Sequence, residues 1–130
     1  MHLSEHELTA ALTGAAKSVV RAQRKDVRKG TVDIDTAWDE MDRLQRFRLL
    51  DALGDQVLPV LAGLPDVEVP PGARPSYPDR QVSEIVSRVV GDEGGRLRRA
   101  VLVKARTALV QAALASVPPR LDPDAFGQDG

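Results

Sequence analysis

The side chains that most often perform acid–base or metal chemistry are scarce in this sequence. The 130 residues include two histidines and no cysteine, so thiolate nucleophiles, disulfide bonds and cysteine-ligated metals are excluded. His2 and His6 lie four residues apart, but His2 precedes the first expected helix, so the two rings need not share a face. No phosphate-binding loop and no G-x-S-x-G motif is present. Proton transfer would therefore depend on carboxylates alone, and we expect no catalytic residues, no metal site and no cofactor.

An acidic cluster is the one place where a divalent cation could bind. Its members are Asp33, Asp35, Asp39, Glu40 and Asp42. The opening Asp-x-Asp resembles the start of a calcium-binding loop, but Trp38 replaces the glycine at loop position six and Leu44 the glutamate at position twelve. Carboxylates are also favourable at the N-terminus of a helix, near the positive end of its dipole. We expect this second role.

Four cations of the first helical segment could follow the phosphates of a nucleic acid. Lys17, Arg21, Arg24 and Arg28 recur at i, i+4, i+7 and i+11. On one helix they would lie within about 60° of one another and span about 16 Å. Each contact with a phosphate would add to a salt-dependent affinity. The alternative is a solvated face whose cations favour the negative end of the helix dipole.

A second basic group, Arg96, Arg98 and Arg99, begins the last expected helix directly after a glycine-containing turn. The base-reading side chains of a helix-turn-helix occupy a similar position, and a helix N-terminus also attracts anions. Asp92 and Glu93 lie beside these arginines, where they would repel phosphate and can form internal ion pairs instead. In a complex with nucleic acid, Arg98 and Arg99 are the residues expected to contact bases.

Helices must position these residues, and the helix expected over 95–117 is the central one. It is apolar nearly all round, which is typical of a buried helix. One stripe comprises Leu97, Val101, Ala105, Ala108, Ala112 and Ala115, and a second, roughly opposite, comprises Val103, Val110 and Leu114. We predict that the second stripe forms the interface of a two-fold symmetric dimer. The alternative is that it belongs to the core of a single chain.

The first helix is predicted over 5–28. Ser4 and Glu7 have the spacing of a capping box, in which each side chain accepts a hydrogen bond from the other residue's backbone N–H. Gly30 follows two cations, a pattern typical of a helix C-terminus. Gly14 either weakens this helix or allows a neighbouring helix to approach closely.

The middle of the chain predicts a second helix over about 36–53, capped by Asp35 or Thr36. A short third helix is expected over 56–63 and contains a proline near its first turn. The alternative is one long helix that is kinked at 54–59.

Five prolines make 64–78 a loop that is neither helix nor regular sheet. Within it, Val67 and Val69 could pair briefly with Val32 and Ile34. A further helix follows, with Ser76 and Asp79 as its expected N-terminal cap. It shows an uninterrupted helical period of apolar residues at Val82, Ile85, Val86, Val89 and Val90. A glycine-rich turn then joins it to the last helix as a helical hairpin.

The sequence therefore predicts an all-α fold, a four-helix bundle-like domain over 1–117 with an extra short helix and the C-terminal helix central. Residues 118–130 lack periodicity and are expected to form a flexible tail. The net charge of −1 gives no general attraction to nucleic acid or anionic lipid. No segment has the roughly 18 consecutive apolar residues of a membrane span, and no signal-peptide pattern is visible.

These features together favour a cytoplasmic protein without membrane contact. We expect a protein-interaction or oligomerisation module that self-associates or binds a protein partner of unknown identity. The alternative is a nucleic-acid-binding regulatory protein that uses the basic residues of the first and last helices.

Overall fold

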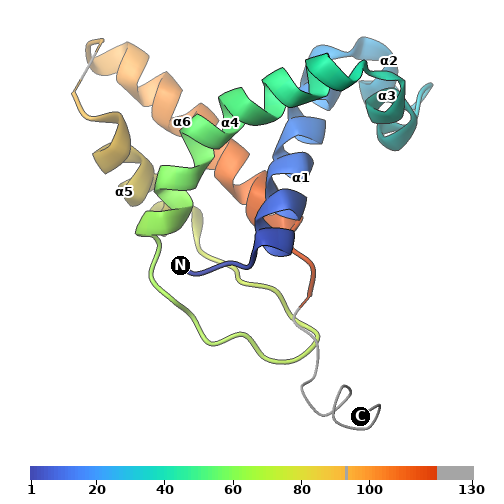
Figure 1. Cartoon of the computed structure of the whole chain (residues 1–130). Helices are drawn as coiled ribbons and strands as arrows, with labels where there is room; N and C mark the ends of the chain where they lie inside the picture. Colours follow the sequence, from blue (N-terminus) through green and yellow to red (C-terminus); the bar gives the residue numbers. More distant parts are fainter. Residues whose placement is uncertain (93, 120–130) are drawn as a thin grey trace, which may run out of the picture.

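A computed structural model describes residues 1–92 and 94–119, and within these residues the chain is helical, with no strand. Its helices are α1 (Glu5–Gln23), α2 (Lys25–Arg28), α3 (Ile34–Glu40), α4 (Arg43–Gly63), α5 (Asp79–Val90) and α6 (Arg96–Ala115) (Figure 1). The all-α prediction is confirmed. Glu93 and, from residue 120 onward, the expected flexible tail lie outside the described residues.

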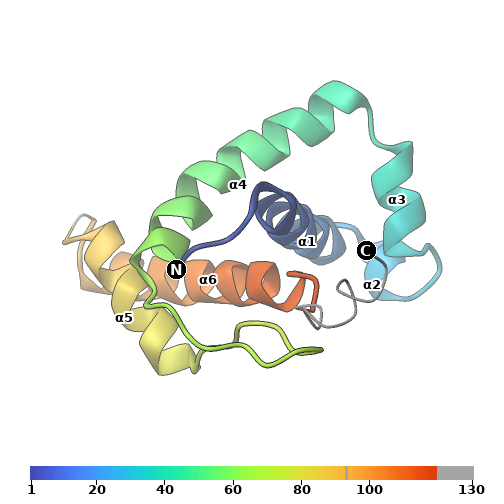
Figure 2. The same cartoon turned by 60° about the horizontal axis from the view of Figure 1, so that its bottom comes forward.

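The last helix, α6, is the central one, as predicted. It packs against α1, α4 and α5, and α4 crosses both α1 and α6 (Figures 1 and 2). The short helices α2 and α3 lie at the far end of α1, away from α5. The core is mainly aliphatic and also contains Trp38 and Tyr77, and fully buried aliphatic side chains come from all the longer helices. Among them are Val57, Val60, Val82, Val86 and Val110.

Glycine allows α1 to approach the end of α6 closely. A Cβ atom added at Gly14 would lie 1.8 Å from the Ser116 hydroxyl oxygen and 2.2 Å from the Ser116 Cβ. The neighbouring α1 residues Ala11 and Ala15 are fully buried. Small side chains therefore replace bulky ones at this crossing, and the second of the two expectations for Gly14 is confirmed.

The first helix begins as predicted but ends earlier. Ser4 accepts a hydrogen bond from the Glu7 backbone N–H at 3.1 Å, and the Glu7 carboxylate accepts one from the Ser4 N–H at 3.0 Å. At Arg24 the backbone becomes extended (φ −100°, ψ 114°), and a separate turn, α2, follows. Asp26 stabilises this break because its carboxylate accepts hydrogen bonds from the Arg24 side chain and from the Val27 N–H. The prediction of one helix over 5–28 was therefore wrong.

The second predicted helix is also interrupted. Met41 is extended, and Asp42 begins α4 with a capping box in which Gln45 is the partner. The cap of α3 is Asp33 rather than Asp35 or Thr36. From there α4 continues without interruption through Gly54 and Pro59 to Gly63, so a single long helix replaces the short helix expected over 56–63.

The proline-rich segment is a loop, as expected, and both of its ends are tied to the core. The buried Tyr77 donates its hydroxyl hydrogen to the Pro65 carbonyl at 2.5 Å, and Arg74 Nε donates to the Val117 carbonyl at 3.0 Å. Because the Tyr77 ring is buried, and because Asp66 adds negative charge nearby, the pKa of its phenol is raised.

Two local predictions around this loop were wrong. Val67 and Val69 form no strand with Val32 and Ile34, because Ile34 is the first residue of α3. The residue that precedes α5 is Pro78, and no side chain caps this helix, so Ser76 does not have the predicted role.

Candidate interaction surface

The stripe predicted to form a dimer interface lies in the core of the single chain. Val110 is 0% exposed and Leu114 is 2% exposed, while Val103 is partly buried and packs against the same core. The helices that pack on α6 enclose Val110 and Leu114, so these two residues offer no surface to a second copy, whereas Val103 lines a groove between α5 and α6. Val110 and Leu114 therefore belong to the core of the single chain, which is the alternative that the sequence left open for this stripe.

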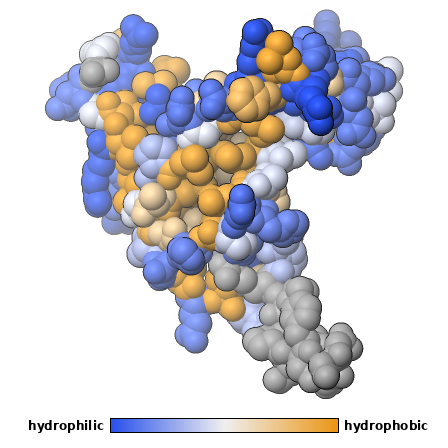
Figure 3. Space-filling view, in the orientation of Figure 1, coloured by the Kyte–Doolittle hydropathy of each residue, from blue (hydrophilic) through white to orange (hydrophobic). Residues whose placement is uncertain are grey.

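The opposite stripe of α6, which was expected to belong to a buried rod, is the exposed one. Leu97 is 84% exposed and Val101 is 70% exposed, and Ala105 and Ala108 are exposed on the same line. We call these four residues the α6 ridge. Their spacing of four, four and three residues keeps them on one side of the helix over about 16 Å. Figure 3 shows apolar surface over the region where α4, α5 and the first half of α6 meet.

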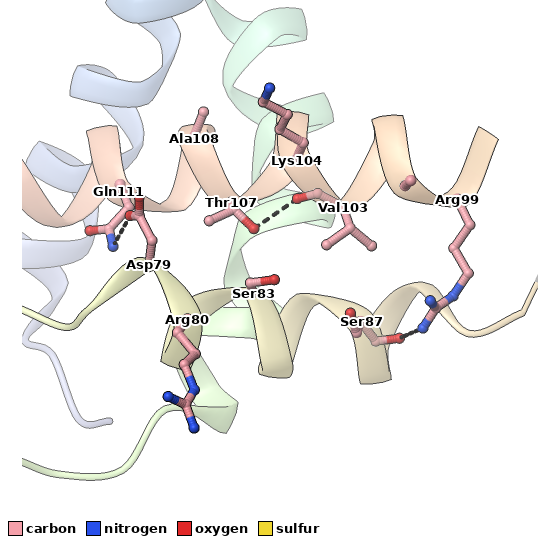
Figure 4. A pocket seen from close by; sticks show the side chains of 11 residues that line it. Asp79, Arg80, Ser83, Ser87, Arg99, Val103, Lys104, Thr107, Ala108 and Gln111 are labelled. Carbon is pink, nitrogen blue, oxygen red and sulfur yellow. Dashed lines mark hydrogen bonds between the residues drawn. The ribbon is translucent and has the colours of Figure 1, made fainter. Parts of the chain in front are cut away.

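A groove of about 830 Å³ lies between α5 and α6, beside the ridge (Figure 4). Val103 and Thr107 of α6 face Ser83 and Ser87 of α5 across it. The Thr107 hydroxyl donates a hydrogen bond to the Val103 carbonyl of its own helix at 2.7 Å, so it needs no partner from α5. The lining combines small or apolar residues, such as Ala100, Val103 and Ala108, with charged or polar residues that include Lys104.

Hydrogen bonds from α6 side chains join α6 to α5 and its flanking residues at both ends of the groove. At one end, Arg99 donates to the carbonyl oxygens of Ser87 at 3.3 Å and Gly91 at 2.5 Å. At the other end, Gln111 Nε2 donates to Asp79 Oδ1 and to the Tyr77 carbonyl, both at 2.9 Å. The hairpin is therefore held together at its two ends, and the groove between them stays open.

A smaller hollow of about 480 Å³ lies against the ridge and is lined by α6 residues that include Leu97, Arg98 and Leu102. Lys104 lines the larger groove, whereas Arg98 lines this smaller hollow. The ridge thus stands between two depressions, and each depression has a cation at its edge.

The charge on α6 has one sign only. Between Arg96 and Ala115 the helix carries five cations and no acidic residue: Arg96, Arg98, Arg99, Lys104 and Arg106. Arg99 is held by the carbonyls of α5 and lies 3.9 Å from the exposed Asp92 carboxylate. Arg96, Arg98 and Lys104 are exposed and form no ion pair with any residue in the described part of the chain. The ridge therefore lies on a positively charged surface.

The basic stripe predicted on the first helix is not a continuous row. Lys17 forms an ion pair with Asp35 at 2.9 Å, and Arg24 forms one with Asp26 at 2.7 Å. The Asp26 carboxylate accepts hydrogen bonds from the Arg24 side chain and from the Val27 N–H, and these bonds hold the pKa of the Asp26 carboxyl below its usual value. Arg21 is exposed on α1, whereas Arg28 lies beyond the break on α2. The four cations therefore do not share one helical face.

Three members of the acidic cluster have structural roles. Asp33 caps α3, Asp42 caps α4, and Asp35 forms the ion pair with Lys17. Within residues 1–92 and 94–119, no group of three or more histidine or carboxylate side chains is placed to hold a metal ion. Of the two histidines, His2 precedes α1 and His6 lies on it, and both are exposed.

No helix in the described part of the chain combines the length and the apolar character that crossing a membrane requires. Comparison of the chain with models of protein families, with curated proteins and with solved structures gave no match.

Proposed function

We propose that this protein is a protein-interaction module that binds a protein partner through the α6 ridge and the groove beside it. The observation that carries the proposal is the exposure of Leu97 and Val101 on a helix whose opposite face is core. Burial of one such side chain is worth roughly 1.5–3 kcal/mol. Single exposed apolar residues are common on protein surfaces, but a row of them beside an open groove is typical of an interaction site.

The shape of this surface supports a helix as the binding element. Side chains of one helix pack as ridges into the grooves of another, and the α6 ridge with a depression on each side offers this geometry. An amphipathic partner helix would place its apolar residues at i, i+3, i+4 and i+7 against the ridge. The groove between α5 and α6 would receive the side chains along one edge of this partner helix.

A photo-crosslinking experiment tests the proposal. A photoreactive amino acid is placed at Val101 in cells that express the protein, and the same residue is placed at Val67 as a control. Val67 is also an exposed valine, but it lies in the proline-rich loop. We expect discrete adducts from position 101 that position 67 does not give. Equal adducts from both positions, or none from either, would contradict an interaction at the ridge.

Nucleic-acid binding is the second candidate, and it rests on the exposed cations Arg21, Arg28, Arg96 and Arg98. It has less support, because two members of the predicted stripe are neutralised by ion pairs and the row is broken at Arg24. Binding to duplex DNA that weakens with salt at a log–log slope of about −3 to −4 would favour this candidate over the first. We expect no such binding at about 50 mM salt.

A further inference from the structure

Resting on the proposed function, we infer that the partner of the α6 ridge is an amphipathic helix flanked by acidic side chains, supplied by another protein. The inference concerns the chemistry of the partner, and it starts from the one-signed charge of α6. Leu97 and Val101 are the largest exposed apolar side chains of the ridge, and Arg98 and Lys104 flank them. At about 100° per residue these two cations lie on opposite sides of the line through Leu97 and Val101.

A helix seated on the ridge would meet positive charge at both of its edges. Lys104 lines the larger groove on one side, and Arg98 lines the hollow on the other. Among the described residues, Asp79 is the one acidic side chain that lines the groove, and its carboxylate already accepts a hydrogen bond from Gln111. Exposed charges at the edge of an interface contribute mainly to specificity and to the rate of association. This arrangement therefore selects a helix that carries aspartate or glutamate beside its apolar stripe.

The same charges disfavour a second copy of this chain as the occupant. A two-fold axis through the ridge would place α6 against α6, and neither helix has an acidic residue between Arg96 and Ala115. In an antiparallel pair centred near Val103, the Lys104 side chains of the two copies would lie close together at the same edge. Like charges in such positions destabilise a helix pair, and repulsion of this kind weakens binding to partners of the wrong charge. Self-association through the ridge would therefore bury Leu97 and Val101 at the cost of cation repulsion.

The length of the ridge sets the size of the segment that is recognised. Leu97 and Ala108 are eleven residues apart on the sequence, which is about 16 Å along the helix axis. A partner helix of about three turns covers this distance, and three turns carry about five apolar residues on one side. The partner segment is thus a short helix, of the kind that a longer or disordered protein can present.

Designed peptides test the inference without knowledge of the natural partner. The probe is a fluorescein-labelled 18-residue helix with a leucine stripe and glutamate flanks, stabilised by side-chain cross-links. The comparison peptide is identical except that lysine replaces every glutamate. Fluorescence anisotropy of each peptide is measured against the full chain at about 50 mM and 300 mM salt. We expect the glutamate peptide to bind at least ten-fold more tightly at low salt, and the difference to shrink at high salt.

Two variants of the protein assign the binding to the ridge and its flanks. Leu97→Ser with Val101→Ser should reduce the affinity for the glutamate peptide at least ten-fold. Arg98→Glu with Lys104→Glu should reverse the preference, so that the lysine peptide binds more tightly. The control is Arg21→Glu with Arg28→Glu, which changes the net charge by the same amount on exposed residues of α1 and α2 and should leave the preference unchanged. Circular dichroism of every variant checks that the helices are retained.

The possible failures are distinguishable. Equal binding of both peptides would overturn the acidic partner but leave the interaction module in place. The same holds if neither peptide binds at 1 mM protein while photo-crosslinks from position 101 are found. A dimer in light scattering that Val101→Asp dissociates would overturn the inference in favour of a second copy. Absence of both peptide binding and crosslinks would overturn the inference together with the proposed function.

Discussion

The two faces of α6 consist of the same residue types and have opposite environments. The core face carries Val110 and Leu114, which are fully buried, and the ridge carries Leu97 and Val101, which are among the most exposed apolar residues of the described chain. The difference lies in the neighbours. The helices α1, α4 and α5 all pack on the core face, and only the C-terminal part of the opposite face is approached by α1. Apolar side chains on a helix therefore define possible contact faces, and the number of packed neighbours decides which face is buried.

The largest expected effect is a charge placed on the core face. Val110→Asp introduces a carboxylate at a fully buried position where the native side chain has no polar partner. Burial of an unpaired charge should lower the free energy of unfolding by about 4 kcal/mol or more, a large part of the roughly 5–15 kcal/mol of a typical domain. Urea denaturation followed by circular dichroism measures this change. A variant with unchanged stability would show that this face is not the core.

A smaller loss is expected where α1 closes the core face at the end of α6. Gly14→Ala should lower the free energy of unfolding by about 1–2 kcal/mol, because the added Cβ overlaps Ser116 and outweighs the higher helix propensity of alanine. Gly54→Ala is the matched control. Its added Cβ would lie 3.7 Å from Leu58, an ordinary contact, so this variant should gain up to about 1 kcal/mol. If both variants are stabilised, α1 does not approach α6 as closely as described.

The tie between the proline-rich loop and the core should be sensitive to alkaline pH. Burial raises the pKa of Tyr77 in the folded chain, so the folded state favours the neutral phenol, which donates to Pro65. The resulting stability is fully present below the unfolded pKa of about 10 and is lost as pH rises through the higher folded value. Tyr77→Phe should cost about 0.5–1.5 kcal/mol at pH 8 and remove this part of the alkaline loss. Urea midpoints from pH 8 to pH 11 measure both effects, and parallel pH curves for the two proteins would contradict the assignment.

The smallest expected change in stability is on the ridge. Val101→Asp should alter the free energy of unfolding by less than about 0.5 kcal/mol, because the side chain is already 70% exposed. A photoreactive residue placed at the neighbouring position 97 should also give crosslinks if the ridge is the interaction site, and Val101→Asp should abolish them. Together with Val110→Asp, it makes a matched pair of identical chemical changes on opposite faces of one helix. Equal destabilisation by the two substitutions would remove the distinction between ridge and core.

Several features could be predicted because their causes are local. The capping box of Ser4 and Glu7 acts within one helical turn, and the apolar period of α5 followed by Gly91 needs no partner to be recognised. The same kind of signal was overlooked at Asp42 and Gln45, which have the spacing of the first capping box and begin α4. Recognition of this pair would have placed the break between α3 and α4 from sequence alone.

What the sequence by itself determined is the helical class and the loop at 64–78, because helix periodicity, caps and prolines act over a few residues. The apolar character of the last helix on nearly all sides also indicated its central place. Only the tertiary structure decided which face of α6 is inside. Apolar residues line both faces, while Thr107, Gln111 and Arg99 add polar groups on the side that packs against α5. The hydrophobic effect has no direction of its own. The packing of α1, α4 and α5 around one side of α6 therefore set Val110 and Leu114 in the core and left Leu97 and Val101 as the ridge.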